Sequence, residues 1–210
     1  MIILGAGGHA KEILELVHCD GRTDNLCFFD DFNPDAHDIF MNKFKILRSK
    51  NELENYFLNQ DENFIIGVGG TVLRKQMNDK AESMGGKLIS IISKYAYIGS
   101  FDVDLENGLN IMHGAWISNS VKIGKGTLLN AYVKIHHDTT IGEYTEIAPS
   151  VTILGACNIG SFVSIGASAT LLPKINIGNN VVIGSGSIVT KDVPDNVMVY
   201  GVPAKIIKQF

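Results

Sequence analysis

Two adjacent histidines followed by an aspartate are the residues of this sequence best suited to proton transfer. They are His136, His137 and Asp138. Histidine exchanges a proton near neutral pH, and an adjacent carboxylate can fix its tautomer and stabilise the imidazolium. His137 and Asp138 are therefore the candidate catalytic pair, with His137 as general base, and the alternative interpretation is a histidine on a solvated turn.

A metal site is a second interpretation of the histidines. His113, His136 and His137 lack the spacing of a ligand set within one chain, and the adjacent His136 and His137 side chains are expected to diverge. We therefore expect no bound metal.

A six-residue repeat occupies the second half of the chain. Every sixth residue from Leu105 to Val189 is Leu, Ile or Val, and the residue four places later is small or mostly β-favouring. An α-helix turns by about 600° over six residues, which leaves successive apolar side chains about 120° out of line. The repeat therefore predicts short strands separated by turns.

Three such units close a triangular coil of 18 residues, and coils stack at about the 4.8 Å spacing of neighbouring strands. The repeat accounts for five coils, with the apolar residues pointing inward and glycines such as Gly124 and Gly142 easing the corners. Ile98 and Gly99 begin a similar unit one residue out of phase, which predicts an irregular first coil.

Residues 18 apart stack in one column of such a prism, so Gly155 follows His137 on the next coil. A histidine beside a glycine predicts a base next to a gap, and we expect the thin arm of a thioester cofactor to lie in that gap.

The N-terminal part begins as a strand, a glycine turn and a helix. A helix N-terminus presents free N–H groups and a positive dipole end to a phosphate, and glycines let the backbone approach it. A second strand ends in two aspartates, where a nucleotide-binding βαβ unit places carboxylates near a ribose or base. A third apolar run ends in glycines that border the same crevice. The candidate nucleotide-binding residues are Gly7, Gly8, His9, Asp30, Asp31 and Gly69. A glycine turn that only packs helix against strand is the alternative.

Length and composition limit the remaining possibilities. Only about 95 residues precede the repeat, too few for a complete dinucleotide-binding fold, so the sequence predicts a Rossmann-like α/β domain over 1–94 and an all-β domain over 95–210. The net charge of -4 gives no basic face for nucleic acid, and no long uncharged apolar run predicts a membrane span. Three cysteines without ligand spacing fit reduced thiols in the cytoplasm.

Motifs along essentially the whole chain resemble those of the NeuD/PglD-like sugar acetyltransferases. They are Gly5-Ala6-Gly7-Gly8-His9, Phe29-Asp30-Asp31, His137-Asp138 followed by Ile141-Gly142, Ile147-Ala148-Pro149, Val189 to Pro194, and Gly201 to Lys205. The resemblance implies a short Rossmann-like domain followed by a left-handed parallel β-helix that forms a homotrimer. The handedness comes from the resemblance, because periodicity does not fix it.

The resemblance also implies roles for single residues. His137 is the general base and Asp138 orients it. Asn130 lies near the reacting group, while Gly7, Gly8 and His9 meet a diphosphate and Asp30 and Asp31 meet the nucleoside. Backbone at Gly155, Ala167 and Ser185 lines an acetyl-CoA groove between subunits. Glu146 stands where many relatives carry a second histidine, so it is either structural or contacts substrate.

The expected activity is acetyl transfer from acetyl-CoA to the amino group of a nucleotide-linked 4-amino sugar in glycan biosynthesis. O-acetylation of a sialic acid or related sugar is one alternative. A trimeric scaffold or nucleotide sensor without catalysis is another.

Overall fold

The computed structural model describes residues 1–32 and 38–210. The chain divides into two units. The first comprises Met1–Gly69 and Leu73–Ile91, and the second comprises Gly70–Val72 and Ile92–Phe210.

The first unit is an α/β fold around one sheet with the strand order β3-β4-β2-β1-β5-β6. All neighbouring strands in it are parallel except β3 and β4, which are antiparallel. In chain order its elements are β1 (Ile2–Leu4), α1 (Gly8–Cys19), β2 (Cys27–Phe29), β3 (Ile39–Phe40), β4 (Phe44–Leu47), α2 (Lys50–Asn59), β5 (Asn63–Ile66), α3 (Thr71–Glu82) and β6 (Lys87–Leu88).

β1 is central in this sheet because all of its side chains are apolar. Ile2, Ile3 and Leu4 are fully buried, as expected for a strand of a parallel sheet covered on both faces. Leu4 pairs with Phe29 of β2 and with Ile66 of β5. The carboxyl ends of these three strands therefore meet at one edge of the sheet, where ligands of open α/β sheets bind.

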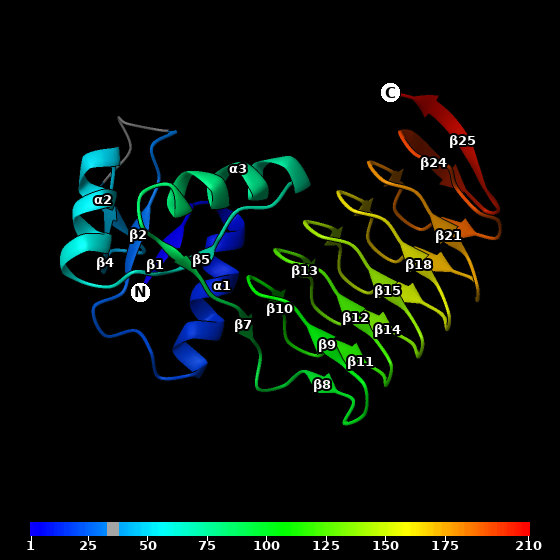
Figure 1. Cartoon of the computed structure of the whole chain (residues 1–210), viewed down its shortest axis with the longest axis horizontal. Helices are drawn as coiled ribbons and strands as arrows, with labels where there is room; N and C mark the ends of the chain where they lie inside the picture. The colour runs from blue at the N-terminus through cyan, green and yellow to red at the C-terminus, as the bar shows by residue number, and fades with distance from the viewer. Residues whose placement is uncertain (33–37) are drawn as a thin grey trace. The chain divides into compact units, whose positions relative to one another are not determined.

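The second unit is a prism of stacked coils with three sheets as its faces (Figure 1). Its first face comprises β7 (Ile91–Ile92), β10 (Asn110–Ile111), β13 (Leu128–Leu129), β16 (Glu146–Ile147), β19 (Ser164–Ile165), β22 (Val182–Ile183), β24 (Val197–Gly201) and β25 (Ala204–Gln209). The second face comprises β8 (Tyr97–Ile98), β11 (Trp116–Ile117), β14 (Lys134–Ile135), β17 (Thr152–Ile153), β20 (Thr170–Leu171) and β23 (Ile188–Val189). The third face comprises β9 (Asp104–Leu105), β12 (Lys122–Ile123), β15 (Thr140–Ile141), β18 (Asn158–Ile159) and β21 (Asn176–Ile177).

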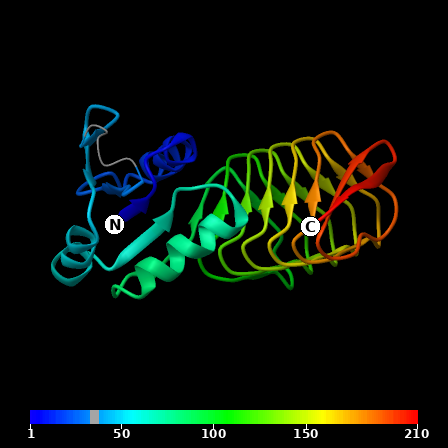
Figure 2. The ribbon, with the colours of Figure 1, turned by 90° about the horizontal axis from the view of Figure 1, so that it is seen from above.

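The coils follow one another along the prism, as Figure 2 shows. We call the turn between the first and second faces the first corner, the turn between the second and third faces the second corner, and the turn that returns to the first face the third corner. A hairpin of β24 and β25 follows the last coil.

The predicted inward positions form the core of the prism. Each of them from Ile111 to Val189 is at most 4% exposed, and Leu105 at the start of the repeat is partly buried against the same core. Trp116 pairs with Lys134, a step of 18 residues, but Tyr97 pairs with Trp116, a step of 19. The irregular first coil is therefore confirmed, because it holds one extra residue.

The corners use left-handed backbone, but not at the glycines such as Gly142 that were expected to ease them. Asp138, three residues after the inward Ile135, has a φ of 58°, and equivalent residues on other coils also have positive φ. Gly142 follows the inward Ile141 directly, and a Cβ there would lie 2.6 Å from the carbonyl carbon of Gly160. Glycine is thus required at Gly142 by the close approach of stacked backbones rather than by its own dihedral angles.

Among the described residues, no helix is long and apolar enough to cross a membrane.

Candidate active site

His137 and Asp138 form a hydrogen-bonded pair at the second corner. Nδ1 of His137 lies 2.7 Å from Oδ2 of Asp138, and the two side chains are 63% and 62% exposed. A carboxylate only accepts, so Nδ1 carries the proton and Nε2 is left as the basic nitrogen. The left-handed conformation of Asp138 turns its carboxylate back towards the preceding ring. The pair therefore presents an accessible base with a fixed tautomer.

Gly155 supports the imidazole from the next coil. A Cβ on Gly155 would lie 2.6 Å from Cε1 and 2.7 Å from Nε2 of His137, so the ring occupies the space that a side chain would fill. The backbone beneath is fixed, because the N–H of Ala156 donates to the carbonyl of His137 at 2.8 Å. The gap that we expected to hold a thioester arm is thus filled by the imidazole itself.

His136 does not share this role. Its ring lies 5.0 Å from that of Trp116 in an edge-on arrangement on the second face. Burial lowers the pKa of His136, and the nearby His137 and Lys134 lower it further. His136 is therefore a neutral side chain packed on the indole of Trp116 at the surface of the prism, and it is not part of the catalytic pair.

The other predicted residues of this unit lie away from the second corner. Asn130, Ala167 and Ser185 all follow first-face strands and so lie at the first corner, with the second face between them and His137. Among the described residues, the backbone N–H groups of Gly155, Ala167 and Ser185 donate no hydrogen bond within the chain. One copy of the chain does not bring the predicted groove residues together, but the first and second corners both offer free donors.

Glu146 lies on β16 of the first face. Its Oε2 accepts a hydrogen bond at 2.5 Å from the backbone N–H of Gly70, which belongs to the same unit. This contact supports a structural role, which is one of the two roles that the sequence left open.

In the first unit the predicted nucleotide-binding residues follow β1, β2 and β5 at the shared edge of the sheet. Gly7 is the N-cap of α1, and a Cβ at Gly7 or Gly8 would meet no atom within 4 Å, so the turn is open to a ligand. Gly69 comes after β5, at the same edge. His9 bonds to Glu12 through Nδ1 at 3.2 Å.

Two basic residues near the aspartates were missed by the sequence analysis. Lys80 of α3 forms an ion pair with Asp31 and lies 4.9 Å from the centre of the Phe29 ring. Arg48, just after β4, donates from Nη1 to the backbone carbonyl of Asp30 at 3.0 Å. The Asp30 carboxylate accepts from the N–H of Phe32. Lys80 was not predictable because it lies 49 residues from Asp31 in sequence.

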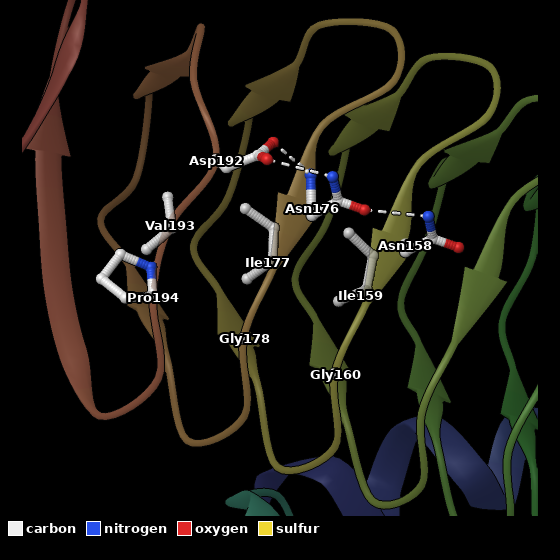
Figure 3. Close-up of a pocket in the computed structure, with 9 residues that line it drawn as sticks. All are labelled: Asn158, Ile159, Gly160, Asn176, Ile177, Gly178, Asp192, Val193 and Pro194. Carbon is white, nitrogen blue, oxygen red and sulfur yellow. Dashed lines mark hydrogen bonds between the residues drawn. The ribbon is translucent and has the colours of Figure 1, made fainter.

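An open depression of about 510 Å³ lies on the third face of the prism, and neither His137 nor Gly155 lines it (Figure 3). Its polar side chains satisfy one another, since Asn158 donates to Asn176 at 2.9 Å and Asn176 donates to Asp192 at 3.0 Å. Among the residues that the structure describes, no group of three or more His, Cys, Asp or Glu could hold a metal ion.

Two family models match the chain. Residues 1–81 match the PglD N-terminal domain. Residues 120–155 and 156–191 match the bacterial transferase hexapeptide family of six repeats.

Solved structures match both units together. Perosamine N-acetyltransferase from Caulobacter crescentus, solved as a variant with CoA and GDP-perosamine, is 26% identical with a TM-score of 0.92, covering 99% of this chain and 96% of that chain. The acetyltransferase domain of PglB from Neisseria gonorrhoeae FA1090 is 26% identical with a TM-score of 0.90, covering 98% of both chains. WeeI from Acinetobacter baumannii AYE is 26% identical with a TM-score of 0.89, covering 98% of both chains.

The prism is therefore a left-handed β-helix, and the chain is a transferase of the hexapeptide-repeat class. It belongs to the PglD/NeuD-like family and is an acetyl-CoA-dependent sugar acetyltransferase. The alternative of a scaffold without catalysis is set aside by these matches.

Proposed function

We propose that this enzyme acetylates the amino group of a nucleotide-linked 4-amino sugar. The observation that carries the proposal is the exposed imidazole of His137, whose ring is held in place and whose Nε2 is left as the proton acceptor by the 2.7 Å bond from Nδ1 to Asp138. Support for an amine acceptor comes from the Caulobacter crescentus enzyme, whose structure contains CoA and GDP-perosamine.

The chemistry is direct transfer between two bound substrates. Nε2 of His137 takes a proton from the amine as its nitrogen forms a bond to the acetyl carbon, and the same proton can pass to the thiolate when the carbon–sulfur bond breaks. We expect the free N–H of Gly155 to donate to the acetyl oxygen as negative charge develops there. No covalent enzyme intermediate is needed, because orientation brings amine and thioester together.

We further propose that the site forms between copies of the chain in a homotrimer. His137 and Gly155 lie at the second corner, whereas Asn130, Ala167 and Ser185 lie at the first. A neighbouring copy that places its first corner against the second corner supplies the missing half of the acetyl-CoA groove, where free N–H groups on both corners can meet its amide-rich arm. The molar mass in solution, from light scattering, should be three times 22.8 kDa.

The nucleotide part of the substrate is assigned to the first unit. Gly7, Gly8 and His9 face the diphosphate at the start of α1, and Asp30 and Asp31 face the nucleoside. Gly69 closes the same edge of the sheet. Because Lys80 already pairs with Asp31, we expect Asp30 to be the freer of the two carboxylates for the base. We assign the enzyme to the cytoplasm, and Cys19, Cys27 and Cys157, none of which forms a disulfide, agree with that compartment.

The test is acetyl transfer by the full-length protein and by His137→Ala. GDP-perosamine and a UDP-linked 4-amino sugar are offered with acetyl-CoA, against free and CMP-linked sialic acid. We expect transfer to an amine, and a loss of about 10²–10⁴-fold in kcat for His137→Ala, the usual worth of a general base. His18→Ala, an exposed histidine on α1, is the matched control. Transfer only to sialic acid, or full turnover by His137→Ala, contradicts the proposal.

A further inference from the structure

A second imidazole is held at the first corner of the prism, on the coil before that of Asn130. Ser93 is 4% exposed, and its Oγ lies 2.5 Å from Nδ1 of His113. The backbone N–H of Tyr95 donates to the same Oγ at 3.0 Å. His113 follows the inward Ile111 by two residues, as His137 follows Ile135, so the two histidines occupy equivalent positions of the repeat.

These contacts assign the tautomer of His113. Ser93 is buried, and among the described residues Nδ1 of His113 is the one acceptor that its hydroxyl contacts, so the hydroxyl proton donates to Nδ1 while the oxygen accepts from Tyr95. Nδ1 is then the acceptor nitrogen and Nε2 carries the ring proton. Among the described residues, Nε2 of His113 has no hydrogen-bond partner. Because Ser93 is buried, it is suited to orienting the ring rather than to attacking a substrate.

The ring is also held by its surroundings. The Tyr95 ring meets it edge-on at 5.3 Å, and the N–H of Tyr132 donates to the His113 carbonyl at 3.1 Å. Tyr95 and Tyr132 are 62% and 64% exposed, although both carry large aromatic rings. The Tyr132 ring lies over Gly114, the residue after His113. A fixed donor beside exposed aromatic rings is suited to a ligand that has both hydroxyl groups and apolar C–H faces, as a sugar has.

The order of the coils places this corner on the acceptor side. Gly155, Ala167 and Ser185, proposed to line the acetyl-CoA groove, lie on coils after His137. Asn130 lies on the same coil as His137, and His113 lies on the coil before. In direct transfer the amine must approach the thioester from the side that the donor does not fill.

We propose that Nε2–H of His113 donates a hydrogen bond to a hydroxyl oxygen of the acceptor sugar, and that Ser93 is the positioning residue that fixes this donor. The His113 concerned belongs to the copy that supplies Asn130. This inference rests on the proposed function, because it assumes that an amino sugar reaches His137 from this side.

Two substitutions of His113 distinguish a role in binding the sugar from a purely structural role. The amide of Gln places an N–H donor where Nε2 lies, whereas Asn keeps an acceptor for Ser93 and loses that donor. We expect His113→Asn to raise KM for GDP-perosamine by about 10-fold with KM for acetyl-CoA unchanged, and His113→Gln to raise it by less than about 3-fold. A merely structural histidine predicts the reverse order, because only Asn preserves the Ser93 contact.

Ser93→Ala tests the positioning role and serves if a His113 variant does not fold. We expect KM for the sugar to rise about 3-fold or more with little change in kcat. His18→Asn is the control. If the wild type transfers acetyl to the sugar and both His113→Asn and Ser93→Ala keep its KM, this inference fails while the proposed function stands. If the wild type transfers no acetyl to GDP-perosamine or the UDP-linked sugar, the proposed function itself fails.

Discussion

The imidazole of His137 lies against the α-carbon of Gly155, one coil further along the prism. A Cβ on Gly155 would be 2.6 Å from Cε1 of that ring, well inside van der Waals contact. The missing side chain therefore decides where the base can sit, and the bond to Asp138 decides which of its nitrogens is basic.

Gly155→Ala is expected to displace the base. The new methyl group forces the ring to rotate, which breaks the bond between Nδ1 and Asp138 and moves Nε2 from its position. We expect kcat to fall by about 10–100-fold, part of the usual contribution of a general base, with a smaller change in KM for acetyl-CoA. Pro173→Ala, one coil further in the same column, is the control. A variant that raises only KM for acetyl-CoA places an arm of the cofactor over Gly155 instead.

Asp138 should contribute to catalysis by orienting the His137 ring and by its negative charge. Two substitutions distinguish these contributions. Asn tolerates the left-handed backbone and its amide oxygen still accepts from Nδ1, but its charge is lost. Ala loses the acceptor altogether. We expect kcat to fall by about 10²-fold for Asp138→Ala and by clearly less for Asp138→Asn, measured at saturating substrates. Equal losses in both variants would assign the effect to charge alone.

The two residues of β15 should differ strongly in their effect on stability. Ile141 is 1% exposed inside the prism, and Thr140 beside it faces outward. Ile141→Ala should lower the free energy of unfolding by about 2–5 kcal/mol, because a cavity remains in a closely packed core. Thr140→Ala should change it by less than about 0.5 kcal/mol. Urea unfolding of both variants checks this, and similar values would contradict an inward Ile141.

The start of α2 should contribute to the stability of the fold, and this contribution should be lost in acid. Ser49 and Glu52 form a reciprocal capping box, and the N–H of Arg48 also donates to Glu52. This backbone bond is the main cause that holds the pKa of Glu52 below its usual 4.5, although slight burial opposes it. The unfolded chain therefore binds a proton first as the pH falls, so the contribution is present above pH 4.5 and is lost as the pH drops through the folded pKa.

Ser49→Ala should cost about 1 kcal/mol at neutral pH, the usual value of an N-cap. The difference in stability between the wild type and Glu52→Gln should shrink between pH 6 and about pH 3, measured by thermal unfolding of both proteins. Lys50→Gln, an exposed neighbour without a part in the box, is the control. A difference that stays constant with pH would contradict the lowered pKa.

Much of the fold was predictable from the sequence because each six-residue unit repeats the same pattern of one inward apolar residue and one corner. An inward Leu, Ile or Val and a corner are specified within one unit, and stacking follows from strand pairing. The phase change near Ile98 even predicted the irregular first coil, which the 19-residue step from Tyr97 to Trp116 confirms. His137 and Asp138 were predictable as a pair because they are adjacent in sequence.

The tertiary structure alone decided which side chains fill the spaces between coils. The 18-residue spacing placed Gly155 next to His137, but only the rotamer of the ring shows that the imidazole, not a ligand, occupies that space. Lys80 reaches Asp31 across 49 residues, and Ser93 reaches His113 across 20, in the irregular first coil, where paired strand residues are 19 rather than 18 apart. Periodicity fixes backbone positions, because each hydrogen-bonded step is local. Contacts between remote side chains depend on rotamers and packing that no short stretch of sequence contains.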